Sequence, residues 1–319
     1  MRSSITAALV VSGCLLALSA SPAAQGARGG NPSENIRAAR AALREGRTAD
    51  ALAAVRREAQ ANPASTAAAN LLDTLGATAD ARAIFQRIAD AATDPAAKAA
   101  ALRGIAMSYA FDGDCANTVK YEDMVIAYWV TREQAEPQNA FYQEGEMANE
   151  GARVCIDFGK LDIAEKYYRL GRELGLKEPA PKTHPASLWE YRTAHALARL
   201  AARHGNAAEA RRQIAEARRI LDADPTMAAA QERFFPYLTG YVALYLNDLK
   251  TAETDLTKAL ATPGNTNDPF MHWLLGTTYE KLGQPDKAKE LLAKAYNLAT
   301  AHNPPAAFVR ATLRTPNSR

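Results

Sequence analysis

The chain has 319 residues, of which 48% are hydrophobic and 23% are charged, and its formal net charge at pH 7 is +3. Such a small excess excludes the strongly basic surface with which proteins bind nucleic acid. A chain of this length exceeds most single globular cores, whereas an array of stacked repeats reaches it without a domain boundary. We therefore expect one extended array and no nucleic-acid partner.

Residues 1–24 have the three parts of a secretory signal peptide. Arg2 provides the positive charge, residues 5–18 are the apolar stretch, and residues 21–23 form a cleavage site of small residues. Residues 25–31 are Gly-rich and polar, which predicts a flexible leader. The mature protein is therefore expected in the periplasm or outside the cell.

A second interpretation of the same N-terminal segment remains open. Residues 11–14, Val-Ser-Gly-Cys, resemble a bacterial lipobox, in which Cys14 would become the lipidated first residue of a membrane-anchored lipoprotein. Elsewhere in the sequence, no apolar stretch reaches the roughly 20 residues that a membrane-spanning helix requires. We therefore expect contact with a membrane only if Cys14 is lipidated.

The rest of the chain predicts helices. Ala, Glu, Arg and Leu are abundant, and no segment alternates apolar and polar residues as a strand would. Asn shares with Gly the ability to adopt the left-handed backbone of a helix–helix turn. Seven such turn residues follow one another at intervals of roughly 30 to 46 residues, which predicts seven antiparallel helix pairs with longer helices or connections in the middle: Gly46, Gly76, Gly113, Gly159, Gly205, Asn247 and Gly283.

The clearest helix pair lies between Phe270 and Pro305. Its small and large apolar residues recur on two successive helices around one turn. The first helix has Leu275, Gly276 and Tyr279, the turn has Leu282 and Gly283, and the second helix has Ala288, Leu292 and Ala295. This pattern resembles the tetratricopeptide repeat, although Trp273 lies one position later than the Trp of that repeat. The resemblance implies an all-α, right-handed solenoid in which the first helix of each pair lines a concave surface.

A Pro-rich connection divides the array. Pro179, Pro181 and Pro185 exclude a helix there, because Pro lacks an N–H group and restricts the residue before it. We interpret it as a long loop between stacked units rather than a free hinge. The organisation that we expect is units one to four over residues 32–176, the Pro-rich loop over 177–187, units five to seven over 188–303, and an end cap and tail over 304–319.

Two cysteines follow the predicted signal peptide. Cys115 begins the second helix of unit three, and Cys155 lies near the end of the first helix of unit four. Because these helices are expected to be antiparallel neighbours, the two thiols can lie within disulfide distance, which an oxidising compartment favours. The alternative is a pair of buried, reduced thiols.

The sequence offers little evidence of catalysis. It contains no Gly-rich phosphate loop and no nucleophile elbow, and its five histidines lack the spacing of a metal site. Glu144, Glu146 and Glu150 with Asp157 are the nearest approach to paired carboxylates, and we interpret them as a solvated helix face. We therefore expect neither an enzyme nor a metal or other cofactor.

The candidate binding residues lie on the first helices of units five to seven. They form a basic set and an aromatic set. The members of each set are three or four positions apart along their helix and therefore share one helix face. The basic set is Arg192, His195, Arg199 and Arg203, and the aromatic set is Phe234, Tyr237, Tyr241 and Tyr245, to which unit seven adds Trp273. Guanidinium groups form bidentate hydrogen bonds with carboxylates, and Tyr and Trp provide rigid contact area.

These two sets predict a non-catalytic, exported scaffold whose concave groove binds a protein or a peptide with an acidic group. Two structural alternatives remain open, since the aromatic set is also consistent with packing between units and the basic set with a solvated face. Two functional alternatives also remain, namely a carrier of a small molecule or carbohydrate, and an envelope-assembly lipoprotein anchored at Cys14.

Overall fold

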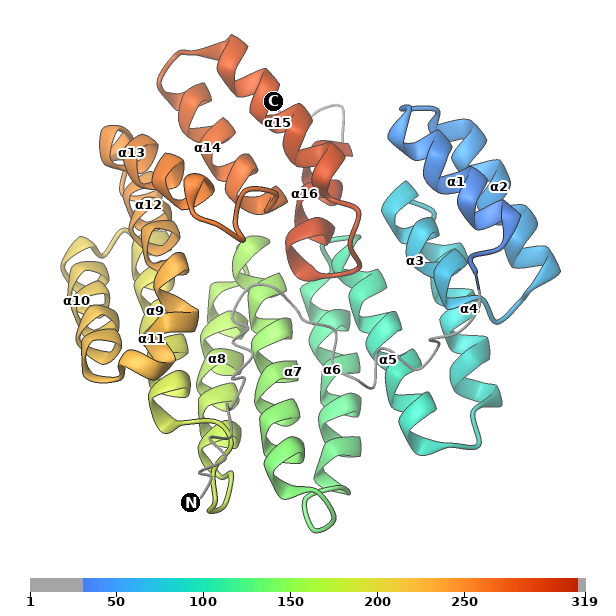
Figure 1. The fold of residues 1–319 in the computed structure, drawn as a ribbon, viewed down its shortest axis with the longest axis horizontal. Coiled ribbons are helices and arrows are strands. Elements are labelled where there is room, and N and C mark those ends of the chain that lie inside the picture. The colour runs from blue at the N-terminus through green and yellow to red at the C-terminus, as the bar shows by residue number, and fades with distance from the viewer. Residues whose placement is uncertain (1–30, 315–319) are drawn as a thin grey trace, which may run out of the picture.

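The computed structural model describes residues 31–314 as a curved array of helix pairs. Figure 1 shows the pairs side by side in an arc that runs from α1 at the right to α14 and α15 at the top. The predicted signal peptide, the lipobox at Cys14, nearly all of the leader and the last five residues of the tail lie outside the described residues. No helix within residues 31–314 has both the length and the apolarity of a membrane span.

Seven helix pairs follow one another along the chain, and the described residues contain no strand. The pairs are α1 (Glu34–Arg44) with α2 (Thr48–Ala61), α3 (Thr66–Leu75) with α4 (Thr78–Ala91), α5 (Pro95–Ala110) with α6 (Cys115–Val130), α7 (Pro137–Asp157) with α8 (Leu161–Leu176), α9 (Ala186–Arg203) with α10 (Ala207–Ala223), α12 (Phe235–Tyr245) with α13 (Leu249–Ala261), and α14 (Pro269–Lys281) with α15 (Pro285–Leu298). The short segments α11 (Pro225–Gln231) and η2 (Glu232–Phe234) precede α12, and α16 (Pro304–Arg314) follows α15.

Each pair turns at the residue that the sequence predicts. The six glycines of these turns have φ between 71° and 86°, and Asn247 has φ of 63°. A left-handed residue ends the first helix and lets the second fold back, and Gly and Asn adopt this conformation at the lowest cost. The predicted all-α array of seven helix pairs is therefore confirmed, including its longer helices in the middle, where α7 has 21 residues against 10 in α3.

Small residues let neighbouring helices approach closely. A Cβ atom added at Gly175 of α8 would lie 2.0 Å from the Trp189 ring of α9, and one at Gly145 of α7 would lie 2.9 Å from the carbonyl oxygen of Gly171. Both distances are shorter than any van der Waals contact, so only glycine fits at these two positions. The middle of the array is therefore tightly packed where α7, α8 and α9 meet.

The Cys115–Cys155 disulfide joins α6 to α7. The structure places the two Cα atoms 5.0 Å apart and bonds the sulfurs to each other. Both residues are buried, and the bond joins the start of one helix to the end region of its antiparallel neighbour. The disulfide therefore links units three and four covalently.

The Glu178 carboxylate organises the Pro-rich loop between α8 and α9. It accepts hydrogen bonds from the backbone N–H groups of Thr183 and His184, at 2.5 and 3.2 Å, and from the Thr183 hydroxyl at 2.8 Å. The His184 ring stacks on Tyr142 of α7 with 3.8 Å between the ring centroids. These contacts hold the loop against unit four.

The C-terminal helix α16 crosses the inner side of the array. The first helices of neighbouring units contact one another, as α9 does α12 and α12 does α14, and α16 lies against α14 and α15 as well as α5 and α7 (Figure 1, red). Just before it, His302 Nε2 lies 2.8 Å from Asp73 Oδ2 of α3. The segment expected to cap the last unit therefore also contacts units three and four, and the nearby His302 contacts unit two.

Candidate functional site

The predicted basic set lies on one face of α9, but that face is largely buried. Arg192, His195 and Arg199 are 6%, 7% and 4% exposed, and Arg203 at the end of the helix is half-buried. The reason is that α9 packs against α12, the first helix of the next unit. The alternative of a solvated face is therefore wrong for the first three residues.

The aromatic set is the surface against which α9 packs. Tyr237 and Tyr241 of α12 are buried, as is Phe234 of η2, whereas Tyr245 is half-buried. The His195 ring stacks on Tyr237 with 5.5 Å between centroids. Tyr237 and Tyr241 therefore pack between units, and a ligand could reach the set only at its two ends.

Trp273 of α14 contacts the chain's own C-terminal helix. Its ring stacks on Phe270 at 5.7 Å and meets the Phe308 ring of α16 edge-on at 4.7 Å between centroids. Phe308 also packs against Phe158, at the end of α7, with 5.1 Å between centroids. The Trp273 ring was predicted to contact a partner, but α16 packs against it instead.

A cavity of about 110 Å³ lies between α7, α8, α9, η2 and the start of α16. Four of the nine predicted binding residues line it, namely Arg192, His195, Arg199 and Phe234. Pro304 and Pro305 of α16 form part of its apolar wall. The cavity therefore combines a polar surface from α9 with an apolar surface from η2 and α16.

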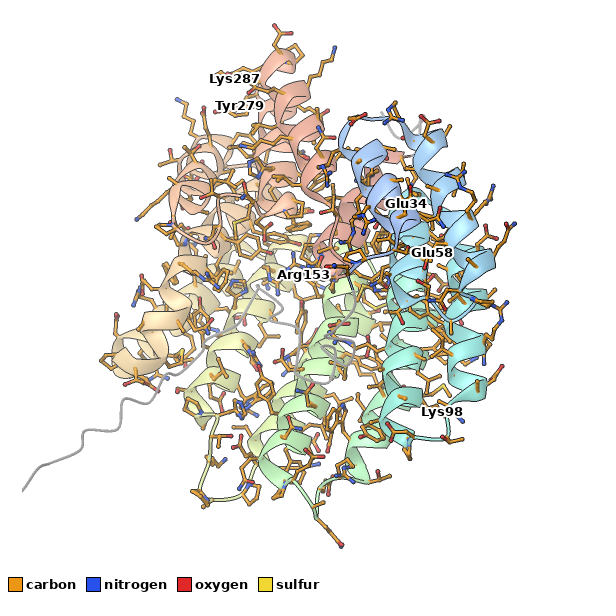
Figure 2. All side chains as sticks on the ribbon, turned by 45° about the vertical axis from the view of Figure 1, so that its right-hand side comes forward. Glu34, Glu58, Lys98, Arg153, Tyr279 and Lys287 are labelled. Carbon is orange, nitrogen blue, oxygen red and sulfur yellow. A yellow bond between two sulfur atoms is a disulfide. The ribbon has the colours of Figure 1, made fainter. Side chains whose placement is uncertain are left out.

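Two arginines that line the cavity are neutralised by carboxylates. Arg192 pairs with Glu146 of α7, and Arg153 Nε lies 2.7 Å from Asp157 Oδ2 on the same helix. Figure 2 shows Arg153 in the interior of the molecule, and its guanidinium lies 4.4 Å from the centroid of the Phe270 ring. A carboxylate that lines the cavity, Glu150, likewise pairs with Arg103 of α5 at 2.6 Å.

Arg199 differs from these arginines because hydroxyl groups surround it. Its Nη2 donates to the Tyr168 hydroxyl at 3.0 Å and its Nη1 to the Tyr237 hydroxyl at 3.4 Å. Within residues 31–314, Arg199 forms no ion pair with a carboxylate. A guanidinium cannot lose its proton in a protein, so the cavity carries an excess positive charge at Arg199.

The Tyr191 hydroxyl oxygen and His195 Nε2, also on α9, lack hydrogen-bond partners among the described residues. Both side chains line the cavity, and both are more than nine-tenths buried. Burial, followed by the charges of Arg199 and Arg153, lowers the pKa of His195 well below its usual value. The imidazole is therefore neutral near pH 7, and it adds no second charge to that of Arg199.

Residues 271–302, which make up most of α14 and α15, match the family model of the tetratricopeptide repeat. These residues form a tetratricopeptide repeat. The matched unit is the one whose pattern is clearest in the sequence, and the same architecture extends over the other helix pairs. No curated protein matches the chain.

Sequence reasoning misjudged the burial of the acidic residues on α7, the longest of the described helices. Glu144 and Glu150 are buried, as is Asp157, and Glu146 is half-buried, so their interpretation as a solvated face is wrong. The cause is that α7 packs against α6, α8 and α16 at once. The length of α7 is a signal that could have revealed this, because a helix of 21 residues has room to pack against several neighbours.

The described part of the chain contains no cluster of three or more His, Cys, Asp or Glu side chains suited to a metal ion. The predicted basic residues that a ligand could still reach are those that line the cavity and Arg203 at the end of α9. The guanidinium of Arg203 donates to the hydroxyls of Tyr241 and Tyr245, each at 3.3 Å. These two places are the candidate sites.

Proposed function

We propose that this protein, with its array of helix pairs, is a non-catalytic scaffold that binds an acidic segment of another protein on the inner side of units five and six. The observation that carries the proposal is the environment of Arg203. Its guanidinium lies 4.6 Å from the centroid of the half-buried Tyr245 ring. Within residues 31–314 it forms no ion pair, because the nearby Asp157 already pairs with Arg153.

An acidic segment suits this place for two reasons. A guanidinium with free N–H groups forms charge-assisted, bidentate hydrogen bonds with a carboxylate, and an adjacent tyrosine ring adds contact area with little loss of side-chain entropy. An array of helix pairs presents such groups from rigid helices, so a partner can bind through several modest contacts along one surface. The accessible part of the basic and aromatic sets therefore favours a protein partner at Arg203 and Tyr245.

The burial of the predicted binding residues determines which variants can test this proposal. Tyr241 is fully buried, so replacing it would destabilise the fold as well as any binding surface. Arg203 is the better choice, because Arg203→Gln removes the charge and keeps most of the side chain's volume. Arg211→Gln is the matched control, since Arg211 is exposed on α10, a second helix.

The experiment measures the binding of a fluorescent Glu-rich peptide by anisotropy, with a Gln-rich peptide of the same length beside it. We expect the wild type to bind the Glu-rich peptide more tightly and to weaken with added salt. Arg203→Gln should weaken binding about tenfold, which is about 1.4 kcal/mol, while Arg211→Gln leaves it unchanged. Equal losses in the two variants, or equal binding of the two peptides, would exclude this surface.

We also propose that the protein is exported, because residues 1–24 have the composition of a signal peptide. The Cys115–Cys155 disulfide supports this, since such bonds persist mainly in oxidising compartments. The mass of the mature N-terminus tests the proposal. Cleavage near Ala23 supports a soluble periplasmic or secreted protein, a diacylglyceryl group on Cys14 supports the anchored lipoprotein, and an uncleaved chain contradicts both.

A further inference from the structure

The cavity beside α9 holds polar groups that the fold itself does not satisfy. Tyr191, His195 and Arg199 are four positions apart, so they form one stripe along the helix, and all three line the cavity. The Tyr191 side chain is 1% exposed, and its hydroxyl lacks a partner in the described structure. A buried polar group left in this state destabilises the fold, and a bound ligand can provide the missing hydrogen bond.

The charges around the cavity indicate what kind of ligand fits. The positive charges of Arg192 and Arg153 are balanced by Glu146 and Asp157, and Glu150 is balanced by Arg103. Arg199, 4% exposed, is the cation that remains without a carboxylate among the described residues. One excess positive charge in a buried place matches one negative charge on a ligand, because unbalanced charges of either sign are strongly disfavoured there.

The walls of the cavity restrict the ligand further. Phe234 of η2, with Pro304 and Pro305 of α16, provides an apolar surface opposite the stripe of α9. A ligand with a polar end and an apolar body would satisfy both surfaces, as in most small-molecule sites. A volume of about 110 Å³ suits a small molecule or a single side chain rather than a peptide segment.

We propose that this cavity binds a small monocarboxylate. The carboxylate pairs with the Arg199 guanidinium and accepts a hydrogen bond from the Tyr191 hydroxyl, and the apolar part of the ligand lies against Phe234 and Pro304. This site is separate from the surface at Arg203 and does not depend on the proposed scaffold function. Because Pro304 and Pro305 belong to α16, a bound ligand would also contact the C-terminal helix.

The test uses the purified full-length protein and three pairs of probes, namely acetate, propanoate and benzoate, each beside its neutral amide, with inorganic phosphate as a further anion. Affinities are measured by isothermal titration calorimetry at pH 7. Tyr191→Phe is the informative variant, because it removes only a hydroxyl that makes no hydrogen bond within the described residues. Tyr121→Phe is the matched control, since Tyr121 stacks on Tyr109 at a distance from the cavity lining.

We expect at least one carboxylate to bind, its amide to bind at least tenfold more weakly, and Tyr191→Phe to weaken the carboxylate at least tenfold while Tyr121→Phe does not. The proposal is overturned if no carboxylate binds, if amides bind as well, if phosphate binds more tightly than every carboxylate, or if Tyr191→Phe has no effect.

Binding of the Glu-rich peptide distinguishes the two sources of a carboxylate. Under the proposal Tyr191→Phe leaves that peptide unaffected, and the tightest small carboxylate does not compete with it. Competition, with equal weakening of both ligands by Tyr191→Phe, would assign the cavity to a side chain of the protein partner instead and overturn the small-molecule site. A failure at Arg203 would leave these results unchanged, so the two proposals fail separately.

Discussion

At the scale of single residues, the packing of α7 against its neighbours holds ionisable groups away from water. Glu144 of α7 is fully buried, and its carboxyl group lies close to that of Glu133. Burial, followed by the charge of Glu133, raises the pKa of Glu144 to about 7. The folded protein therefore holds a proton on Glu144 at pH values where the unfolded chain has lost it.

This shift makes stability depend on pH in a definite direction. Because the folded pKa lies above the unfolded one, the contribution of Glu144 is fully present below about pH 4.5 and is lost as pH rises through about 7. Glu144→Gln keeps the shape and removes the charge. We expect it to raise the free energy of unfolding by about 1 to 3 kcal/mol at pH 8 and by much less at pH 4.5, measured by urea denaturation.

The exposed Glu290→Gln serves as the control for that measurement, and it should change stability by less than about 0.5 kcal/mol at either pH. An equal effect of Glu144→Gln at pH 4.5 and at pH 8 would contradict the raised pKa. It would show that the amide acts through packing rather than through charge.

At the scale of elements, the disulfide and α16 hold together helices of different units. The disulfide joins residues that are 40 positions apart, between α6 and α7. In the chain-entropy model, closing such a loop stabilises the fold by about 3 to 4 kcal/mol. We expect the Cys115→Ala, Cys155→Ala double variant to lose this amount in urea denaturation.

The wild type under reducing conditions provides the matched comparison for the double variant. Reduction should shift its denaturation midpoint in the same direction and by a similar amount, since both treatments open the same loop. If reduction leaves the wild type unchanged, the bond does not stabilise the protein in solution.

Phe308 is the central packing residue of α16. Its side chain is 6% exposed, and its ring contacts those of Phe158, Phe270 and Trp273 from α7 and α14. Replacing a buried Phe by Ala typically costs about 3 to 5 kcal/mol, so Phe308→Ala should lower the free energy of unfolding by about that amount. Met124→Ala is the control, because Met124 on α6 is 42% exposed. A loss no larger than that of the control would mean that α16 is detached in solution.

At the scale of the whole molecule, the turns were predictable because each depends on one residue. Gly113 or Asn247 identifies a left-handed position from its own chemistry, and the periodic apolar residues around it identify the helices. From these signals the seven helix pairs follow. The contact of His302 with Asp73 has no such signal, because it joins residues 229 positions apart and depends on how far the array curves.

The same reasoning explains what could be predicted of the candidate sites. Spacing correctly groups Arg192, Arg199 and Arg203 on one face of α9, because side chains three or four positions apart always share a face. Spacing does not reveal what covers that face. Whether a polar stripe meets solvent or the next helix depends on the position of α12, so Arg199 is buried beside Tyr237 while Arg203, at the helix end, stays accessible.

We propose above that a protein partner binds the inner side of units five and six. The most direct test places a photocrosslinking residue at position 245, beside Arg203, and in a second variant at position 211 on α10. Each variant is irradiated with the Glu-rich peptide, and the crosslinked product is measured by mass spectrometry. We expect crosslinking from position 245 and little from position 211. Crosslinking from position 211 with none from position 245 would contradict it.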